Sequence, residues 1–357
     1  MKIVAFPRDE NPYQELLYGP LREMGNKITY LRQPTGSVAA NALFVTLSLV
    51  TKRILGYEIV HIHWTYTFAT NSRFMRALSF SYYRFLIWLI GQLRFKLVWT
   101  AHNVLPHEMV FDDDRLAREC LVRKADLVIF HNPSAVDDLQ NLGIHAKRHV
   151  VIPHGNYVGY YENVTSRDVA RGYLRVPPSS FVYLQIGFLR PYKGTDELID
   201  AFRRLPHGWD VVLVIAGKCV DSSLRKRIAK AAEQSQQRIL FREGFIPDED
   251  VQHYYAASNA VVLPYRRVTT SGSAVLALSF ERPIIVPDVG SLASLPEQVT
   301  LTYEPTEADG LKGALERAYL SRRRLDSWPK SAADFVEGVS WPAIAAQTDR
   351  AFRGLLG

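Results

Sequence analysis

Short runs of β-branched and other apolar residues recur along the chain, and each stands before a helix-like or loop segment. The first set predicts strands at Lys2–Phe6, Ile59–His63, Leu97–Ala101, Leu127–Phe130 and Val150–Ile152. The second set predicts strands at Val182–Ile186, Val211–Ala216, Ile239–Phe241, Ala260–Leu263, Ile284–Val286 and Leu301–Tyr303. Strands that alternate with helices are typical of parallel sheets covered on both faces. The pattern therefore predicts two successive α/β units.

The boundary between the two units is expected near residues 155–178, where a polar, proline-containing stretch separates the two sets of strands. The chain has 357 residues, a length that suits two α/β domains better than one. We assign residues 1–160 to an N-terminal Rossmann-like domain and residues 161–340 to a C-terminal one. Residues 341–357 are expected to form a helix that packs back on the N-terminal domain. Ligands bind at the carboxyl ends of parallel strands, so the active site is expected in a cleft between the domains.

Composition narrows the class of protein. Apolar residues make up 47% of the chain and charged residues 22%, which predicts a globular protein. Cys120 and Cys219 are the only cysteines, and their spacing supports neither a disulfide framework nor a zinc knuckle. The first residues lack the long apolar core of a secretory signal. We therefore expect a cytoplasmic location and no metal site.

Positive charge is concentrated in one segment of the first half. The chain has a formal net charge of +7, and no acidic residue lies between Glu58 and Glu108. Basic and aromatic residues alternate there: Arg73, Phe74, Arg76, Phe80, Tyr82, Tyr83, Arg84, Phe85, Trp88, Arg94, Phe95 and Lys96. This mixture favours a helix on an anionic membrane surface, at the inner face of the plasma membrane. A core helix with a basic solvated face is the alternative; no nucleic-acid motif accompanies the segment, so nucleic acid is not an expected partner.

Two loops in the second half have the composition of phosphate-binding turns. Residues 182–202 read VYLQIGFLRPYKGTDELIDAF, a strand, a loop with Arg190, Lys193 and Gly194, and then a helix. Glycines let the backbone approach an anion, and the two basic side chains can neutralise a diphosphate. Residues 263–280 read LPYRRVTTSGSAVLALSF, in which the donor-binding candidates are Tyr265, Thr270, Ser271, Gly272 and Ser273. Hydroxyl and N–H groups at a helix start can hold phosphate oxygens without a metal, although a simple capping cluster is the alternative.

A third loop, REGFIPDED at residues 242–250, lies between them. Phe245 offers a ring face for a nucleobase, and the backbone of Ile246 offers hydrogen bonds to a base edge. A plain connecting turn would have a similar sequence.

Taken together, GFLRPYKG, GFIP and LPY followed by TSGSAVLALSFERPIIVPD resemble the donor half of a GT-B glycosyltransferase, over most of residues 180–290. The first half adds HIHW at 61–64, TAHNVLPHE at 100–108 and IPHGNY at 152–157. The whole set is similar to the bacterial β-mannosyltransferases of xanthan-type exopolysaccharide assembly. The resemblance implies a GT-B fold, an acceptor-binding N-terminal domain, GDP-mannose as donor and a lipid-linked or oligosaccharide acceptor. It implies no cofactor beyond the nucleotide-sugar.

The sequence departs from the family 4 retaining glycosyltransferases at two places. Phe188 stands where those enzymes have an arginine after the loop glycine, and residues 269–279 contain no carboxylate. These departures favour an inverting transfer. A retaining, family-4-like enzyme that uses a UDP-sugar, a nucleotide-sugar epimerase and a non-catalytic nucleotide-sugar binder remain the alternatives.

An inverting transfer needs a general base for the acceptor hydroxyl. The candidates follow the predicted strand Leu97–Ala101, and they are Glu108 first, His107 second and His102 third. The residues expected to bind the acceptor or the sugar are Asn11, Tyr13, Asn103 and His154.

Overall fold

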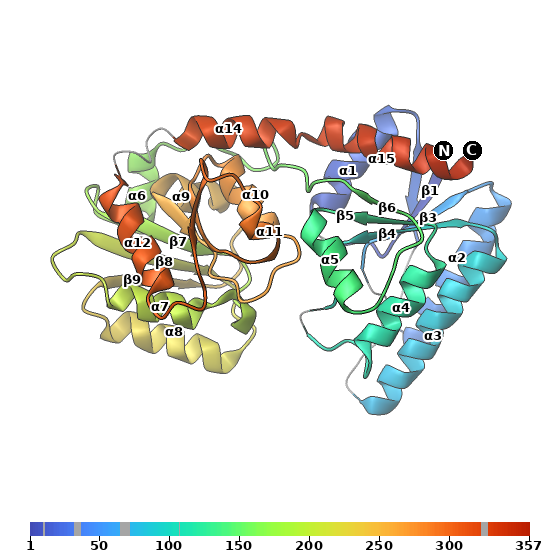
Figure 1. Ribbon diagram of the computed structural model, residues 1–357, viewed down its shortest axis with the longest axis horizontal. Coiled ribbons are helices and arrows are strands. Elements are labelled where there is room, and N and C mark those ends of the chain that lie inside the picture. Colours follow the sequence, from blue (N-terminus) through green and yellow to red (C-terminus); the bar gives the residue numbers. More distant parts are fainter. Residues whose placement is uncertain (10, 32–36, 65–71, 107, 323–327) are drawn as a thin grey trace. The chain divides into compact units, whose positions relative to one another are not determined.

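The computed structural model describes residues 1–9, 11–31, 37–64, 72–106, 108–322 and 328–357. The chain forms two compact units. Unit 1 consists of Met1–Gly155 and Val339–Gly357, and unit 2 consists of Asn156–Gly338. Each unit is an α/β domain built on one six-stranded parallel sheet, as the sequence predicts (Figure 1).

Unit 1 contains the sheet order β2-β1-β3-β4-β5-β6. Its strands are β1 (Lys2–Phe6), β2 (Lys27–Tyr30), β3 (Ile59–Ile62), β4 (Lys96–Ala101), β5 (Leu127–Phe130) and β6 (His149–Val151). Its helices are α1 (Tyr13–Glu23), α2 (Val38–Ile54), α3 (Arg73–Gln92), α4 (Asp114–Lys124), α5 (Pro133–Asn141) and α15 (Trp341–Leu356).

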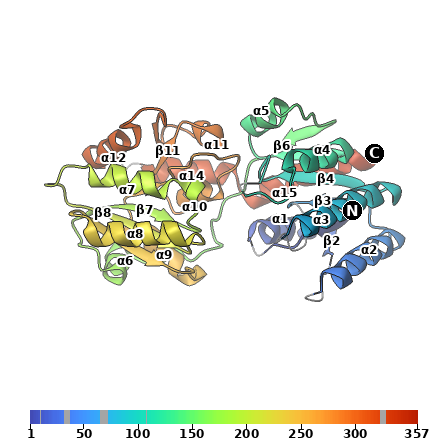
Figure 2. The same ribbon diagram turned by 90° about the horizontal axis from the view of Figure 1, so that it is seen from below.

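Both faces of the unit 1 sheet are buried, because successive side chains along a strand point to opposite faces. On β4, Leu97 and Trp99 join the core beneath α2, α3, α4 and α5, while Val98 joins the core beneath α1 and α15. Figure 2 shows helices on both faces of the sheet in each unit. This two-sided burial explains why the strands read as nearly continuous apolar runs.

Strand β2 was not predicted from the sequence. It lies at the edge of the sheet and pairs only with β1, and its residues Lys27–Tyr30 are partly or fully exposed. An edge strand with one covered face needs few apolar residues, so KITY carries a weak signal.

Helix α15 packs on α1 within unit 1. Trp341, at its first turn, is 6% exposed, and its indole occupies the place where a Cβ on Gly155 would stand. Ile344, Ala345 and Phe352 continue the contact into the core beneath α1. Glycine at position 155 is therefore required by the indole.

Unit 2 contains the sheet order β12-β11-β10-β7-β8-β9. Its strands are β7 (Phe181–Ile186), β8 (Val211–Gly217), β9 (Arg238–Glu243), β10 (Ala260–Val262), β11 (Ile284–Pro287) and β12 (Thr300–Tyr303). Its helices are α6 (Arg167–Leu174), the 3-10 helix η1 (Pro191–Lys193), α7 (Thr195–Arg203), α8 (Ser222–Gln234), α9 (Asp248–Ala257), α10 (Gly272–Ser279), α11 (Gly290–Ala293), α12 (Gly310–Leu320) and α14 (Trp328–Gly338).

The strand order places a topological switch point in each sheet. In unit 2 the chain moves outward from β7 through β8 to β9, then returns to the other side of β7 with β10. In unit 1 the switch lies between β1 and β3. Loops that follow the two strands at such a point diverge, and ligands bind in the space that they leave.

Among the described helices, none has the length and apolar character needed to cross a membrane.

We expect Phe352→Ala to destabilise unit 1 by about 3–5 kcal/mol, because the ring is completely buried and its loss leaves a cavity. Urea unfolding followed by tryptophan fluorescence measures the change. Leu356→Ala, in the same helix at a position that is 36% exposed, is the matched control and should cost far less. Equal effects of the two substitutions would show that α15 does not form part of the core.

Candidate active site

Two loops of unit 2 meet beside the switch point of its sheet. The loop after β7 contains η1, and the loop after β10 leads into α10. The backbone N–H of Arg266 donates a hydrogen bond to the carbonyl oxygen of Tyr192 at 2.9 Å. Gly194 has a positive φ of 66°, and a Cβ there would overlap the carbonyl oxygen of Pro264. The close approach of the two loops therefore requires glycine at position 194.

Lys193 places a buried positive charge in this loop. The residue is 8% exposed, and its ammonium lies 5.4 Å from the centroid of the Tyr265 ring. A Cβ on Gly187 would lie 3.5 Å from the Lys193 Nζ atom, so the ammonium reaches the turn directly after β7. Burial lowers the pKa of Lys193, as does Arg190, while Tyr192 raises it. No carboxylate among the described residues pairs with Lys193, so an anionic ligand is the natural counter-ion.

The start of α10 presents hydroxyl groups next to that charge. Ser271 Oγ accepts a hydrogen bond from the Ala274 N–H at 3.1 Å and so caps the helix, whose first residue is Gly272. Thr270 Oγ1 is buried and has no hydrogen-bond partner among the described residues. Burial raises the pKa of Tyr265 to about 12, although a hydrogen bond with Ser273 acts against the increase. This end of α10 can accept an anion through its N–H groups and hydroxyls.

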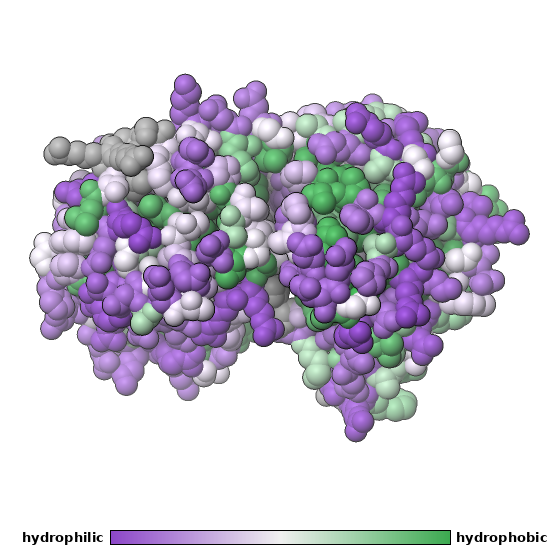
Figure 3. Space-filling view, in the orientation of Figure 1, coloured by the Kyte–Doolittle hydropathy of each residue, from purple (hydrophilic) through white to green (hydrophobic). Residues whose placement is uncertain are grey.

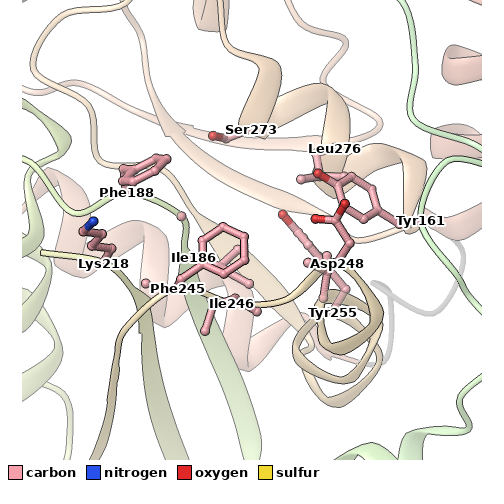
Figure 4. Close-up of a pocket in the computed structure, with 13 residues that line it drawn as sticks. Tyr161, Ile186, Phe188, Lys218, Phe245, Ile246, Asp248, Tyr255, Ser273 and Leu276 are labelled. Carbon is pink, nitrogen blue, oxygen red and sulfur yellow. The ribbon is translucent and has the colours of Figure 1, made fainter. Parts of the chain in front are cut away.

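A pocket of about 190 Å³ opens beside these loops (Figure 4). Gly187 and Phe188 line it from the loop after β7, and Ser273 and Leu276 line it from α10. Phe245, which is 71% exposed, and Ile246 form the wall expected from the third loop. The pocket thus joins the loops that the sequence assigned separately to phosphate and to nucleobase.

Further residues line the pocket that the sequence analysis did not single out, among them Tyr161, Gly217, Lys218, Asp248, Val251 and Tyr255. Lys218 directly follows β8, so the rule that ligands bind after parallel strands could have found it. Asp248 is the first residue of α9, and Figure 4 draws its carboxylate beside the ring of Tyr161. Burial raises the pKa of Tyr161 to about 12, and the Asp248 carboxylate adds to the increase.

Glycine at position 217 allows the turn after β8 to approach the turn after β7. Its φ is 138°, and a Cβ there would overlap the carbonyl oxygen of Gly187. The two glycines therefore shape the floor of the pocket.

In unit 1, a chain of hydrogen bonds joins buried side chains at the carboxyl ends of β3, β4 and β5. Its members, in order, are Thr100, His61, Tyr18, His63, His102, His131 and the carbonyl oxygen of Ile152. The successive distances between their polar atoms are 2.7, 2.8, 2.6, 3.1, 3.2 and 2.9 Å.

The carbonyl at one end fixes the tautomer of every ring. A carbonyl oxygen only accepts, so Nδ1 of His131 carries the proton and its Nε2 accepts from Nδ1 of His102. His102 Nε2 then accepts from Nδ1 of His63. The Tyr18 hydroxyl donates to Nε2 of His63 and accepts from Nδ1 of His61. With all rings neutral, each of these atoms has a matched partner.

The surroundings also favour the neutral rings. Burial, reinforced by neighbouring histidines, lowers the pKa of His61 and of His131 to about 3. Burial holds the pKa values of His63 and His102 well below the usual value. The described residues contain no group of three or more histidine, cysteine or acidic side chains that could hold a metal ion.

Tyr13 connects this chain to the candidate sugar-binding residues. Its ring centroid lies 4.6 Å from that of His102 and 5.1 Å from that of His154. The His154 Nδ1 atom donates to the Gly155 carbonyl at 2.7 Å, and burial lowers the pKa of His154 to about 4. Asn11 Oδ1 accepts from the Tyr13 N–H at 3.0 Å, which fixes the turn before α1.

The remaining candidates of unit 1 lie on the loop after β4. Glu108 is exposed. The carbonyl oxygen of Asn103 accepts a hydrogen bond from the Arg118 guanidinium at 3.5 Å. His107 lies outside the residues that the structure describes. His131 and Tyr18 were missed by the sequence analysis, although His131 directly follows β5 as His102 follows β4.

Known proteins with related sequences are glycosyltransferases. Residues 166–335 match the family model described as glycosyl transferases group 1. The GDP-mannose:glycolipid 4-beta-D-mannosyltransferase of Xanthomonas campestris pv. campestris is 26% identical over 314 residues, which cover 84% of this chain and 81% of the relative. The D-inositol 3-phosphate glycosyltransferase of Corynebacterium aurimucosum is 25% identical, over 74% of this chain and 69% of that protein.

Solved structures share the fold. Sucrose-phosphate synthase from Thermosynechococcus elongatus matches with a TM-score of 0.80 at 19% identity, over 100% of this chain and 99% of that chain. Anabaena HepE in complex with UDP and glucose matches with a TM-score of 0.73 at 17% identity, over 99% of this chain and 100% of that chain.

The two parallel sheets and these matches define the class. The chain has the two-domain α/β fold of GT-B glycosyltransferases, and its residues 166–335 match the glycosyl transferases group 1 family. Within that class, its sequence is similar to a GDP-mannose:glycolipid 4-beta-D-mannosyltransferase, which agrees with the resemblance seen in the motifs.

The histidines of unit 1 predict a steep loss of stability in acid. Their pKa values are lowered in the folded state, so the unfolded chain binds more protons once the pH falls below about 6.5. Between pH 7.5 and 5.5, each of His61, His63, His102, His131 and His154 should lower the free energy of unfolding by about 1.4 kcal/mol. Urea unfolding at the two pH values measures the sum.

His131→Asn keeps a donor for the Ile152 carbonyl and removes one titrating ring. The decrease in the free energy of unfolding between pH 7.5 and 5.5 should therefore be smaller by about 1.4 kcal/mol. His145→Gln, at an exposed position, is the matched control and should leave the pH dependence unchanged. A free energy of unfolding that is the same at pH 7.5 and 5.5 would rule out a neutral chain.

Proposed function

We propose that this glycosyltransferase transfers a mannosyl group from GDP-mannose, with inversion, to a lipid-linked or oligosaccharide acceptor in exopolysaccharide or glycolipid synthesis. The observation that carries the proposal is the buried Lys193 ammonium, which has no carboxylate partner among the described residues and lies beside the start of α10 and the pocket of about 190 Å³. The similarity to a GDP-mannose:glycolipid mannosyltransferase supports the choice of sugar and acceptor.

In the proposed reaction, Lys193 and Arg190 neutralise the diphosphate, and the hydroxyl and N–H groups of Thr270–Ser273 bind its oxygens. The acceptor oxygen attacks the anomeric carbon, the bond from that carbon to the diphosphate breaks, and GDP leaves. Glu108 takes the proton of the acceptor hydroxyl. We favour Glu108 over His102, because both ring nitrogens of His102 already take part in hydrogen bonds.

Guanine suits the pocket walls. Its N1–H and 2-amino groups are two adjacent donors, which one carboxylate can accept together, while O6 and N7 accept from an ammonium. Asp248 and Lys218 supply these two groups on the pocket wall, and Phe245 offers a ring for stacking (Figure 4). Uracil lacks the pair of adjacent donors. A UDP-sugar is the second candidate donor, because HepE of the same fold was solved with UDP and glucose.

We expect Asp248→Asn to raise the Kd for GDP by about 10- to 100-fold, because an amide cannot accept from both guanine donors with the strength of a carboxylate. The Kd for UDP should change little. Isothermal titration calorimetry measures both, and Glu249→Gln, the next residue of α9, is the matched control. A UDP Kd that is lower than that for GDP in the unaltered protein would favour the UDP-sugar reading.

Transfer is tested with radiolabelled GDP-mannose, UDP-glucose and a polyprenyl-diphosphate-linked oligosaccharide. The expected product carries a β-linked mannose, identified by NMR, and Glu108→Gln should lower kcat by about 10²- to 10⁴-fold with the Kd for GDP unchanged. Glu23→Gln, an exposed acid of unit 1, is the control. An α-linked product would establish retention, an isomerised nucleotide-sugar would indicate an epimerase, and binding without turnover a non-catalytic protein.

A further inference from the structure

Helix α2 exposes an apolar stripe that the sequence analysis did not include in the membrane-binding segment. Only Val45 and Leu49 of its 17 residues are buried. Leu43, Leu47 and Ile54 are 60%, 53% and 80% exposed. Their positions i, i+4 and i+11 put them on one side of the helix. A helix of unit 1 thus leaves most of its apolar residues without cover from the described residues.

Helix α3 exposes a second stripe with the same spacing. Phe74, Leu78, Phe85 and Trp88 are 75%, 46%, 39% and 52% exposed, at i, i+4, i+11 and i+14. The opposite side of α3 carries its buried residues, among them Tyr83, Leu86, Ile87 and Ile90. The helix is therefore apolar on two sides, and only one of them is buried against the core of unit 1.

The two stripes face the same side of the helix pair. Tyr82 marks the contact line, because its hydroxyl donates to the Ala42 carbonyl at 2.6 Å and lies 3.1 Å from Thr46 Oγ1. At 100° per residue, the α2 stripe is centred about 100° from this line in one rotational sense, and the α3 stripe about 75° in the other. Both helices cross over between parallel strands, so they run in the same direction. When two parallel helices have stripes rotated in opposite senses from their contact line, both stripes face the same side of the pair.

The positive charge around the two stripes favours an anionic partner for this face. Between residues 24 and 107 the sequence has nine lysines and arginines and one acid, Glu58. Arg73 and Arg84 lie at the outer edge of the α3 stripe, and both are exposed. Asp112 pairs with Arg76 at 2.6 Å and lies 3.9 Å from Arg73, so it offsets part of the charge at one end of α3. In Figure 3, hydrophobic side chains reach the surface beside hydrophilic ones over α3.

We propose that the α2–α3 face, formed by Leu43, Leu47, Ile54, Phe74, Leu78, Phe85 and Trp88, inserts into the surface of an anionic lipid bilayer. Leucine and phenylalanine enter the acyl boundary, the Trp88 indole lies at the headgroup level, and the arginines pair with lipid phosphates. A second copy of the chain is disfavoured, because a symmetric contact would bring the same basic residues together. The face would place unit 1 at the surface that holds a lipid-linked acceptor, and this role alone rests on the proposed function.

Vesicle sedimentation without nucleotide or acceptor tests the face by itself. The full chain should bind vesicles of phosphatidylcholine mixed with phosphatidylglycerol, and bind vesicles of phosphatidylcholine alone at least about tenfold more weakly. Leu43→Ser with Leu47→Ser on α2 should lower the partition coefficient about tenfold or more, as should Phe85→Ser with Trp88→Ser on α3. Val164→Ser, at a position in unit 2 that is 86% exposed, is the matched control and should bind as the unaltered chain does.

Fluorescence separates insertion from simple adhesion. Mixed vesicles should shift tryptophan emission to the blue in the unaltered chain, and this shift should be smaller in Trp88→Phe. Urea unfolding followed by circular dichroism shows whether unit 1 of the α2 variant still folds, because α2 belongs to unit 1 while the nucleotide pocket is in unit 2. Unchanged vesicle binding by the α2 variant would overturn the proposal. So would a stable dimer that Leu47→Ser dissociates in analytical ultracentrifugation. Failure of mannosyl transfer would leave these results standing.

Discussion

The direction of the strands constrains everything else in this protein. Because all the strands of a sheet are parallel, the loops that follow them leave from one edge, and at the switch point two neighbouring loops diverge. In unit 2 these are the loops after β7 and β10, and in unit 1 those after β1 and β3. In each unit, the buried polar residues described above lie at the carboxyl edge of the sheet: the histidine chain in unit 1, and Lys193 with the start of α10 in unit 2. Glycines 194 and 217 then bring three loops of unit 2 into contact around one pocket.

The two units bury polar groups in opposite ways. In unit 1 the donors and acceptors of the histidine chain satisfy one another, so the chain is complete without a ligand. In unit 2 the Lys193 ammonium and the Thr270 hydroxyl are buried without such partners among the described residues. A buried charge without a partner costs several kcal/mol in general, and a bound diphosphate would remove that cost. This contrast supports the proposal that unit 2, and not the histidine chain of unit 1, binds the diphosphate.

Much of the fold could be predicted from the sequence, because strands buried on both faces are continuous apolar runs. The eleven strands predicted at the outset all correspond to strands of the two sheets, and the loops around Lys193 and Ser271 contain the glycine and hydroxyl residues typical of phosphate-binding turns. The edge strand β2 gave no such signal. Lys218 could have been found because it directly follows β8, whereas Asp248 could not be assigned, because its place in the pocket depends on which loops meet in space. Those loops are far apart in the sequence, so the sequence alone does not show that they meet at the pocket.

The histidine chain also shows how buried polar side chains can be held rigidly at the carboxyl edge of a sheet. His131 is fixed by a backbone carbonyl, and each ring along the chain is fixed by the next, so none can rotate without breaking two hydrogen bonds. The Tyr13 ring packs edge-on against His102, His154 and Trp341. Helix α15, which returns from the far end of the sequence, is thereby held against the same edge. Neutral rings matter most at His102 and His131, because a proton added to either ring would set two N–H donors facing each other.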